Sequence, residues 1–148
     1  MPATVDALVV TCVDSPLHRA DKPALAEYLR GKHVGINTWD LLTASGGIRD
    51  LVAADAGGRK EALLHAIRVV HDAHGVSKIL FVNHSACTAY GGSARFRTLT
   101  EEYREHADDL QAARAAVRQL LPNLDIRLFF ATVEERADGH FVTIDEVR

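Results

Sequence analysis

Residues 7–12, Ala-Leu-Val-Val-Thr-Cys, and residues 78–82, Lys-Ile-Leu-Phe-Val, are the two apolar segments that decide the fold. Both are short and rich in β-branched residues, which is typical of strands buried on both faces of a parallel sheet. Segments with helical spacing of apolar residues lie between such strands. This alternation predicts an α/β fold, a three-layer sandwich with a mostly parallel central sheet.

The remaining elements are placed outward from these two strands. Further strands are expected at 33–38, 125–132 and 140–144, with the last paired as an antiparallel hairpin. Helices are expected at 22–29, 48–54, 59–73 and 98–121. Asp21 is a candidate cap for the first helix, and Thr98 or Thr100 for the last, because short polar side chains accept hydrogen bonds from free amides at helix starts.

The length and net charge of the chain limit the classes of function that it can have. The 148 residues are expected to form one α/β domain over 1–148. A net charge of −3 gives no basic surface for nucleic acid or an anionic membrane, so a small-molecule substrate is the expected partner. No stretch approaches the roughly 20 apolar residues of a membrane span. Residues 1–6 lack the basic start of a signal peptide, and we expect a cytoplasmic location.

The chain's only two cysteines follow the two deciding strands. Cys12-Val13-Asp14 ends the first strand, and His84-Ser85-Ala86-Cys87 follows the second. Ligands bind at the carboxyl edge of open α/β sheets, and cytosolic cysteines more often bind metal or react than form disulfides. Two thiolates and one imidazole suit Zn²⁺ and leave a fourth position open for chemistry. Cys12, His84 and Cys87 are therefore the candidate ligands.

These motifs resemble those of the β-class carbonic anhydrases, which take zinc ligands from a Cys-x-Asp-x-Arg motif and a later His-x-x-Cys motif. The turn at 44–51, Ala-Ser-Gly-Gly-Ile-Arg-Asp-Leu, is similar to the family's glycine-rich turn. Residues 87–92, Cys-Thr-Ala-Tyr-Gly-Gly, resemble a branch of the superfamily with a Cys-x-Ala-Tyr-Gly-Gly loop. The order of motifs agrees from about residue 7 to residue 132.

The resemblance implies a function and roles for residues. The family hydrates carbon dioxide reversibly to bicarbonate with a zinc-bound hydroxide, because the metal lowers the pKa of its water. By resemblance, the three candidate ligands hold Zn²⁺, and Asp14 is the catalytic residue that orients the hydroxide. Gly46 and Gly47 would let the backbone pass close to the substrate. The family also implies a homodimer or higher homo-oligomer.

One position departs from the family pattern. Pro16 stands where the family has an arginine that pairs with the aspartate. Asp14 without that partner is itself a candidate fourth zinc ligand, since carboxylates bind zinc well. Arg19 and Arg49 are the candidates for a replacement charge partner. Pro16 is also expected to restrict Ser15 to extended conformations.

Three alternatives stay open. The first is a zinc hydrolase acting on another small electrophile, such as carbonyl sulfide or carbon disulfide. The second is a non-catalytic zinc protein in which Asp14 closes the metal site. The third is a metal-free redox pair of Cys12 and Cys87. The other histidines, including His18 and His106, are expected on the surface or on a helix face.

Overall fold

The computed structural model describes residues 4–148, so the first three residues of segment 1–6, on which the signal-peptide expectation rested, lie outside it. Five strands form one sheet in the order β2-β1-β3-β4-β5. In chain order they are β1 (Ala7–Cys12), β2 (Trp39–Ala44), β3 (Lys78–His84), β4 (Asp125–Arg136) and β5 (Gly139–Val147). The first four are parallel, and β5 pairs with β4 as an antiparallel hairpin. The predicted α/β fold is confirmed.

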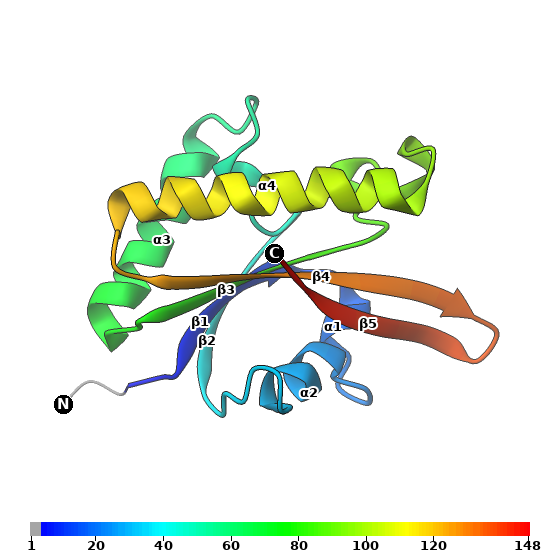
Figure 1. The fold of residues 1–148 in the computed structure, drawn as a ribbon, viewed down its shortest axis with the longest axis horizontal. Helices are drawn as coiled ribbons and strands as arrows, with labels where there is room; N and C mark the ends of the chain where they lie inside the picture. The colour runs from blue at the N-terminus through cyan, green and yellow to red at the C-terminus, as the bar shows by residue number, and fades with distance from the viewer. Residues whose placement is uncertain (1–3) are drawn as a thin grey trace.

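Helices cover both faces of this sheet, which gives the predicted three layers. In chain order they are α1 (Ser15–His18), α2 (Ala24–Arg30), α3 (Gly58–His74) and α4 (Leu99–Leu120). Helices α3 and α4 lie on one side of the sheet, and α1 and α2 lie on the other (Figure 1). Short 3-10 turns occupy Arg49–Leu51, Thr88–Tyr90 and Ser93–Arg95.

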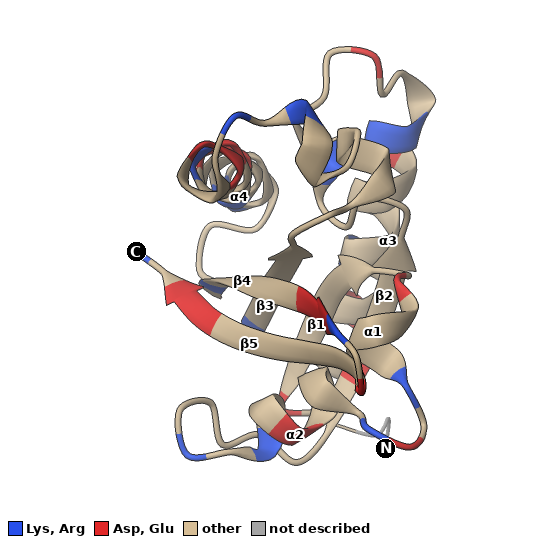
Figure 2. Cartoon of the chain, turned by 90° about the vertical axis from the view of Figure 1, so that its right-hand side faces the viewer, with Lys and Arg blue, Asp and Glu red and all other residues tan. Residues whose placement is uncertain are grey.

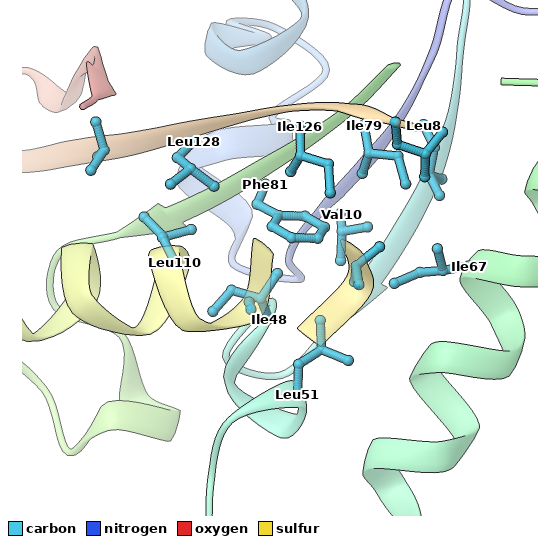
Figure 3. Packing of buried hydrophobic residues seen from close by; sticks show 14 of the residues in the cluster. Leu8, Val10, Ile48, Leu51, Ile67, Ile79, Phe81, Leu110, Ile126 and Leu128 are labelled. Atoms are coloured by element: carbon cyan, nitrogen blue, oxygen red, sulfur yellow. The ribbon is translucent and has the colours of Figure 1, made fainter. Parts of the chain in front are cut away.

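The larger core fills the space between the sheet and the layer of α3 and α4. Phe81 lies at its centre, with Ile48 and Leu110 packed toward it from the 49–51 turn region and from α4 (Figure 3). Along β1 and β3, every second residue points to this core, and the residues between them pack on the opposite face of the sheet against α2. Burial on both faces explains why the two deciding strands read as continuous apolar runs.

Two predictions about the first half of the chain are wrong. Residues 33–38 form a turn and loop rather than a strand, and Gly35 has a φ of +70° there. The strand instead begins at Trp39, on the edge of the sheet, where one face is half-exposed and the apolar alternation is weak. The α2 helix is not capped by Asp21: Pro23 holds the cap position, and Asp21 pairs with Arg19.

Predictions for the second half agree more closely with the structure. Thr98 caps α4 by accepting a hydrogen bond from the amide of Glu101. Charged residues of both signs are scattered over the face seen in Figure 2, as the small net charge predicts. Within residues 4–148, no helix has the length and apolar character needed to span a membrane.

Candidate metal centre

The carboxyl ends of β1 and β3 bring three potential metal ligands together. Cys12 is the last residue of β1, His84 is the last residue of β3, and Cys87 lies in the turn that follows. One ligand atom from each residue lies within 4.8 Å of the others. The three residues are 6%, 1% and 2% exposed, respectively. This buried cluster could hold a metal ion.

The two cysteines are free thiols rather than a disulfide. Their Sγ atoms lie 3.9 Å apart, almost twice the length of an S–S bond at about 2.05 Å. A hydrogen bond from the Cys87 thiol lowers the pKa of Cys12 to about 3, and the same shared proton raises the pKa of Cys87. The pair thus shares one proton that a metal ion would displace, because metals bind thiolates.

His84 presents only one nitrogen to the cluster. Its Nδ1 lies 2.7 Å from the carbonyl oxygen of Ser85, so Nδ1–H donates there and Nε2 keeps its lone pair. Nε2 is buried and has no hydrogen-bond partner among the described residues. Burial opposes the charged ring, but the neighbouring Cys12 outweighs it and raises the pKa of His84. Buried nitrogens usually have a hydrogen-bond partner, so the unpartnered Nε2 beside two thiols indicates a metal ligand.

The glycine turn after β2 packs directly against Cys12. The amide of Gly46 donates a hydrogen bond to the Cys12 sulfur at 3.4 Å. Gly46 and Gly47 have φ values of +83° and +60°. A Cβ on Gly47 would lie 3.0 Å from Oδ1 of Asn83 and 3.3 Å from the Cys12 amide nitrogen. The two glycines therefore let this turn approach the candidate ligand.

Asp14 lies beside the cluster but outside it. Its Oδ2 is 3.6 Å from Nδ1 of His84, and its side chain is 43% exposed. Asp14 is the extended residue that precedes α1, with φ −60° and ψ 130°. The expectation that Pro16 keeps Ser15 extended is wrong, because Ser15 begins α1. Proline fits the first turn of that helix, where its missing N–H costs no hydrogen bond.

The two arginines proposed as charge partners are paired elsewhere. Arg19 binds Asp21 at 2.6 Å, and Arg49 lies 3.5 Å from Asp55. Among the ion pairs within residues 4–148, the partner of Asp14 is His84. The structure therefore does not bring either arginine to the carboxylate that the missing family arginine would have paired with.

Two buried polar residues of α4 that the sequence analysis missed support the site. Glu102 and His106 are 1% and 0% exposed. Glu102 accepts a hydrogen bond from the amide of Ala86, between the two ligands of the second motif. They share the buried face of α4 with Leu110, and two polar residues on an otherwise apolar stripe are the signal that could have found them.

His106 belongs to a buried polar network behind the glycine turn. The Asn83 amide donates to Nδ1 of His106 at 3.0 Å and to the Tyr90 hydroxyl at 3.2 Å. The Tyr90 hydroxyl in turn donates to Asp109 at 2.9 Å. Asn83 also faces Gly47. The network thereby ties the end of β3 to α4 and to the loop after Cys87. His106 lies on a helix face, one of the two places expected for it, but that face is buried rather than on the surface.

His18 was also expected on the surface, and it contacts the site. Its Nε2 lies 2.8 Å from the carbonyl oxygen of Cys12, so the ring donates to the end of β1. Helix α1 places it there, six residues after the cysteine. Its side chain holds the backbone of the first candidate ligand in place.

Comparison with known proteins identifies one family. A family model described as "Putative carbonic anhydrase" matches residues 3–140. The match includes all three residues of the cluster, the glycine turn and Asp14. A search of curated proteins gives no match.

Proposed function

The chain belongs to the carbonic anhydrase-like family whose model it matches, and from this premise we propose that it is a zinc lyase that hydrates carbon dioxide reversibly to bicarbonate. Cys12, His84 and Cys87 would hold Zn²⁺. When bound, zinc lowers the pKa of a water ligand and so supplies a hydroxide nucleophile near neutral pH. The observation that carries the proposal is the buried cluster of two thiols and one unpartnered imidazole nitrogen.

The donor set fits zinc in chemistry and in spacing. Two thiolates bound to one tetrahedral zinc at about 2.3 Å each lie about 3.8 Å apart. The Sγ atoms of Cys12 and Cys87 are 3.9 Å apart. Sulfur and imidazole ligands also disfavour magnesium and calcium, which prefer oxygen. The two sulfur atoms therefore need little movement to accept the ion.

Asp14 would act as the catalytic residue that holds a proton of the nucleophile and orients it. Its carboxylate is next to the cluster without being part of it, which favours an open fourth position. Val13 is exposed and the Asp14 side chain is 43% exposed, whereas the three ligands are buried. We infer that substrate reaches the site past Asp14. The Gly46 amide would stabilise the Cys12 thiolate, and both glycines would line the approach.

A closed site is the competing hypothesis. The observation that favours it is that Asp14 has no arginine partner among the described ion pairs. A carboxylate free to turn toward the metal would occupy the fourth position and exclude water. The protein would then bind zinc without hydrating carbon dioxide.

Stopped-flow hydration of carbon dioxide tests the proposal, on protein whose zinc content has been assayed. We expect about one zinc per chain and activity that rises from about pH 7 to pH 9, where a zinc-bound water ionises. Full zinc occupancy with no activity at any pH would contradict the lyase and favour the closed site. Hydrolysis of carbonyl sulfide or carbon disulfide by such a sample would instead identify a related zinc hydrolase. A homo-oligomer and a cytoplasmic location remain predictions.

A further inference from the structure

Ala86 has an unusual backbone conformation between the two ligands of the second motif. Its φ is +57°, and among residues 4–148 it is the only residue other than glycine with a positive φ. The left-handed region is unfavourable for a residue with a Cβ, which comes too close to the following carbonyl oxygen there. Such strain persists only where the surroundings hold the backbone in place. The turn from His84 to Cys87 therefore needs an external support.

Glu102 of α4 is that support. Its carboxylate is 1% exposed and accepts a hydrogen bond from the Ala86 amide at 2.9 Å. The same carboxylate accepts from the Ser93 hydroxyl, which lies 3.0 Å and 2.9 Å from its two oxygens. Ala86 precedes Cys87, and Ser93 lies six residues after it. The Glu102 side chain therefore holds the segment around Cys87 at two points. Each of these contacts has the length of an ordinary hydrogen bond, and both are shielded from water because Glu102 is buried.

The turn is supported independently on its other side. The Ser85 amide donates to the carbonyl of Ala131, and the Ser85 hydroxyl accepts from the Val133 amide at 2.8 Å. These bonds fix the residue next to His84 to β4. On the α4 side, Glu102 binds the amide nitrogen of Ala86, which lies in the peptide bond that joins Ser85 to Ala86. Loss of Glu102 would thus remove the support that orients the peptide unit before Ala86, while the bonds from Ser85 to β4 remain.

We propose that Glu102 is a positioning residue for the metal, which acts by locking Ala86 in the left-handed conformation that aims Cys87 at the ion. The inference rests on the proposed function, because it assumes that Cys87 is a metal ligand. Glu102 does not itself touch the ion or the substrate. Its effect falls on metal affinity and on the geometry of the sulfur ligand.

The test measures zinc affinity of the full chain by competition with a chromophoric chelator. Glu102→Ala is expected to weaken zinc binding about 10- to 100-fold, as loss of a residue that supports a metal ligand does. Glu102→Gln keeps an oxygen for the Ala86 amide and is expected to lie closer to the unaltered chain. Glu101→Ala is the matched control, since Glu101 is exposed one residue earlier on the same helix, and it should bind zinc like the unaltered chain.

A spectroscopic readout separates positioning from general destabilisation. In Co²⁺-loaded protein, we expect Glu102→Ala to weaken the sulfur-to-cobalt charge-transfer band, whereas Glu101→Ala leaves it unchanged. Ala86→Gly supplies a second measurement, because glycine adopts positive φ without strain. The loss of zinc affinity caused by Glu102→Ala should be smaller in the Ala86→Gly background.

Several outcomes would overturn the inference. One is a folded Glu102→Ala variant whose zinc affinity and cobalt spectrum equal those of the unaltered chain. Another is a Glu101→Ala variant that loses as much zinc affinity as Glu102→Ala. If Glu102→Ala does not fold, zinc affinity is compared between Ser93→Ala and Glu102→Gln. A loss of zinc affinity in Glu102→Gln as large as that in Ser93→Ala contradicts a special role for the hydrogen bond from the Ala86 amide to Glu102. An unaltered chain that binds no zinc would overturn the proposed function as well, whereas zinc binding and hydration unaffected by Glu102→Ala would overturn this inference alone.

Discussion

Oδ2 of Asp14 lies 3.6 Å from Nδ1 of His84, so the exposed carboxylate and the buried imidazole are charge partners. The same Nδ1 donates to the carbonyl of Ser85 at 2.7 Å. Asp14 therefore lies near Nδ1, while Nε2 is the nitrogen left for a metal. This arrangement lets Asp14 support the histidine while staying outside the cluster of ligands.

Asp14→Asn is expected to lower carbon dioxide hydration by about 100-fold, within the range for a residue that handles a proton, while zinc content stays near one per chain. The amide keeps the shape of the side chain and loses its charge. The measurement is kcat/KM at pH 8 with a parallel zinc assay. Unchanged activity would remove Asp14 from the mechanism, and loss of zinc together with activity would identify Asp14 as a ligand.

His84→Ala is expected to abolish stoichiometric zinc binding, because two thiolates from different loops are left without the nitrogen ligand. His65→Ala is the matched control, since His65 is exposed on α3. Zinc content after gel filtration is the measurement, and His65→Ala should retain the metal. Removing zinc from the unaltered chain with a chelator should abolish hydration, and added zinc should restore it. Full zinc in His84→Ala would refute the ligand assignment.

Gly47→Ala is expected to destabilise the fold more than Gly75→Ala does. Both glycines have positive φ, +60° and +61°, so both substitutions carry a left-handed penalty of about 1–2 kcal/mol. A Cβ at Gly75 meets no atom within 4 Å, whereas one at Gly47 meets Asn83 at 3.0 Å. Crowding should add about 1–3 kcal/mol at Gly47, measured by urea unfolding. Equal losses for the two variants would show that the glycine turn moves aside freely.

The lowered pKa of His106 predicts that the stability of the fold depends on pH. Burial, helped by the charges of His84 and Arg95, lowers the pKa of His106 to about 4 from its ordinary 6.5. Between these values the unfolded chain binds the extra proton and the folded chain does not. The free energy of unfolding that His106 contributes is thus present above about pH 6.5 and is lost as pH falls toward 4, by up to about 3 kcal/mol.

The variant His106→Gln isolates this contribution, since glutamine can accept the hydrogen bond from Asn83 and does not titrate. The difference in free energy of unfolding between the unaltered chain and His106→Gln should change in the variant's favour as pH falls from 7 to 4. Denaturant titrations at several pH values provide the measurement. A difference that is constant with pH would show that His106 is accessible to protons in the folded chain.

The parts of the fold that the sequence predicted are those where burial is uniform. Strand β1 and the middle of β3 are apolar and buried, and the helical spacing in α4 follows a single buried stripe. The strand predicted at 33–38 failed because Ile36 is buried from a loop, which produces an apolar position without a strand. The edge strand β2 went unrecognised because half-exposed residues weaken the alternation on which such a prediction depends.

The candidate site was predictable where its residues follow strands. Cys12 and His84 end parallel neighbours, so the topology alone brings them to one edge. Glu102 and His106 could not be placed in the same way, since their roles depend on how α4 is set against the sheet. The family arginine's absence was visible in the sequence, but the actual partner of Asp14 was not. Contacts between side chains of distant elements require coordinates.

Cys12 and Cys87 are separated by 75 positions in the sequence, and one ion bound to both would cross-link the ends of β1 and β3. Before those strands pair, the unfolded chain offers only the local pair in the His84–Cys87 turn, which is a weak chelate. Metal loading must therefore follow assembly of the parallel core, a slow step because it joins distant segments. Once loaded, the thermal midpoint should rise with free zinc concentration. Zinc bound at this site thus marks a chain in which β1 and β3 have paired.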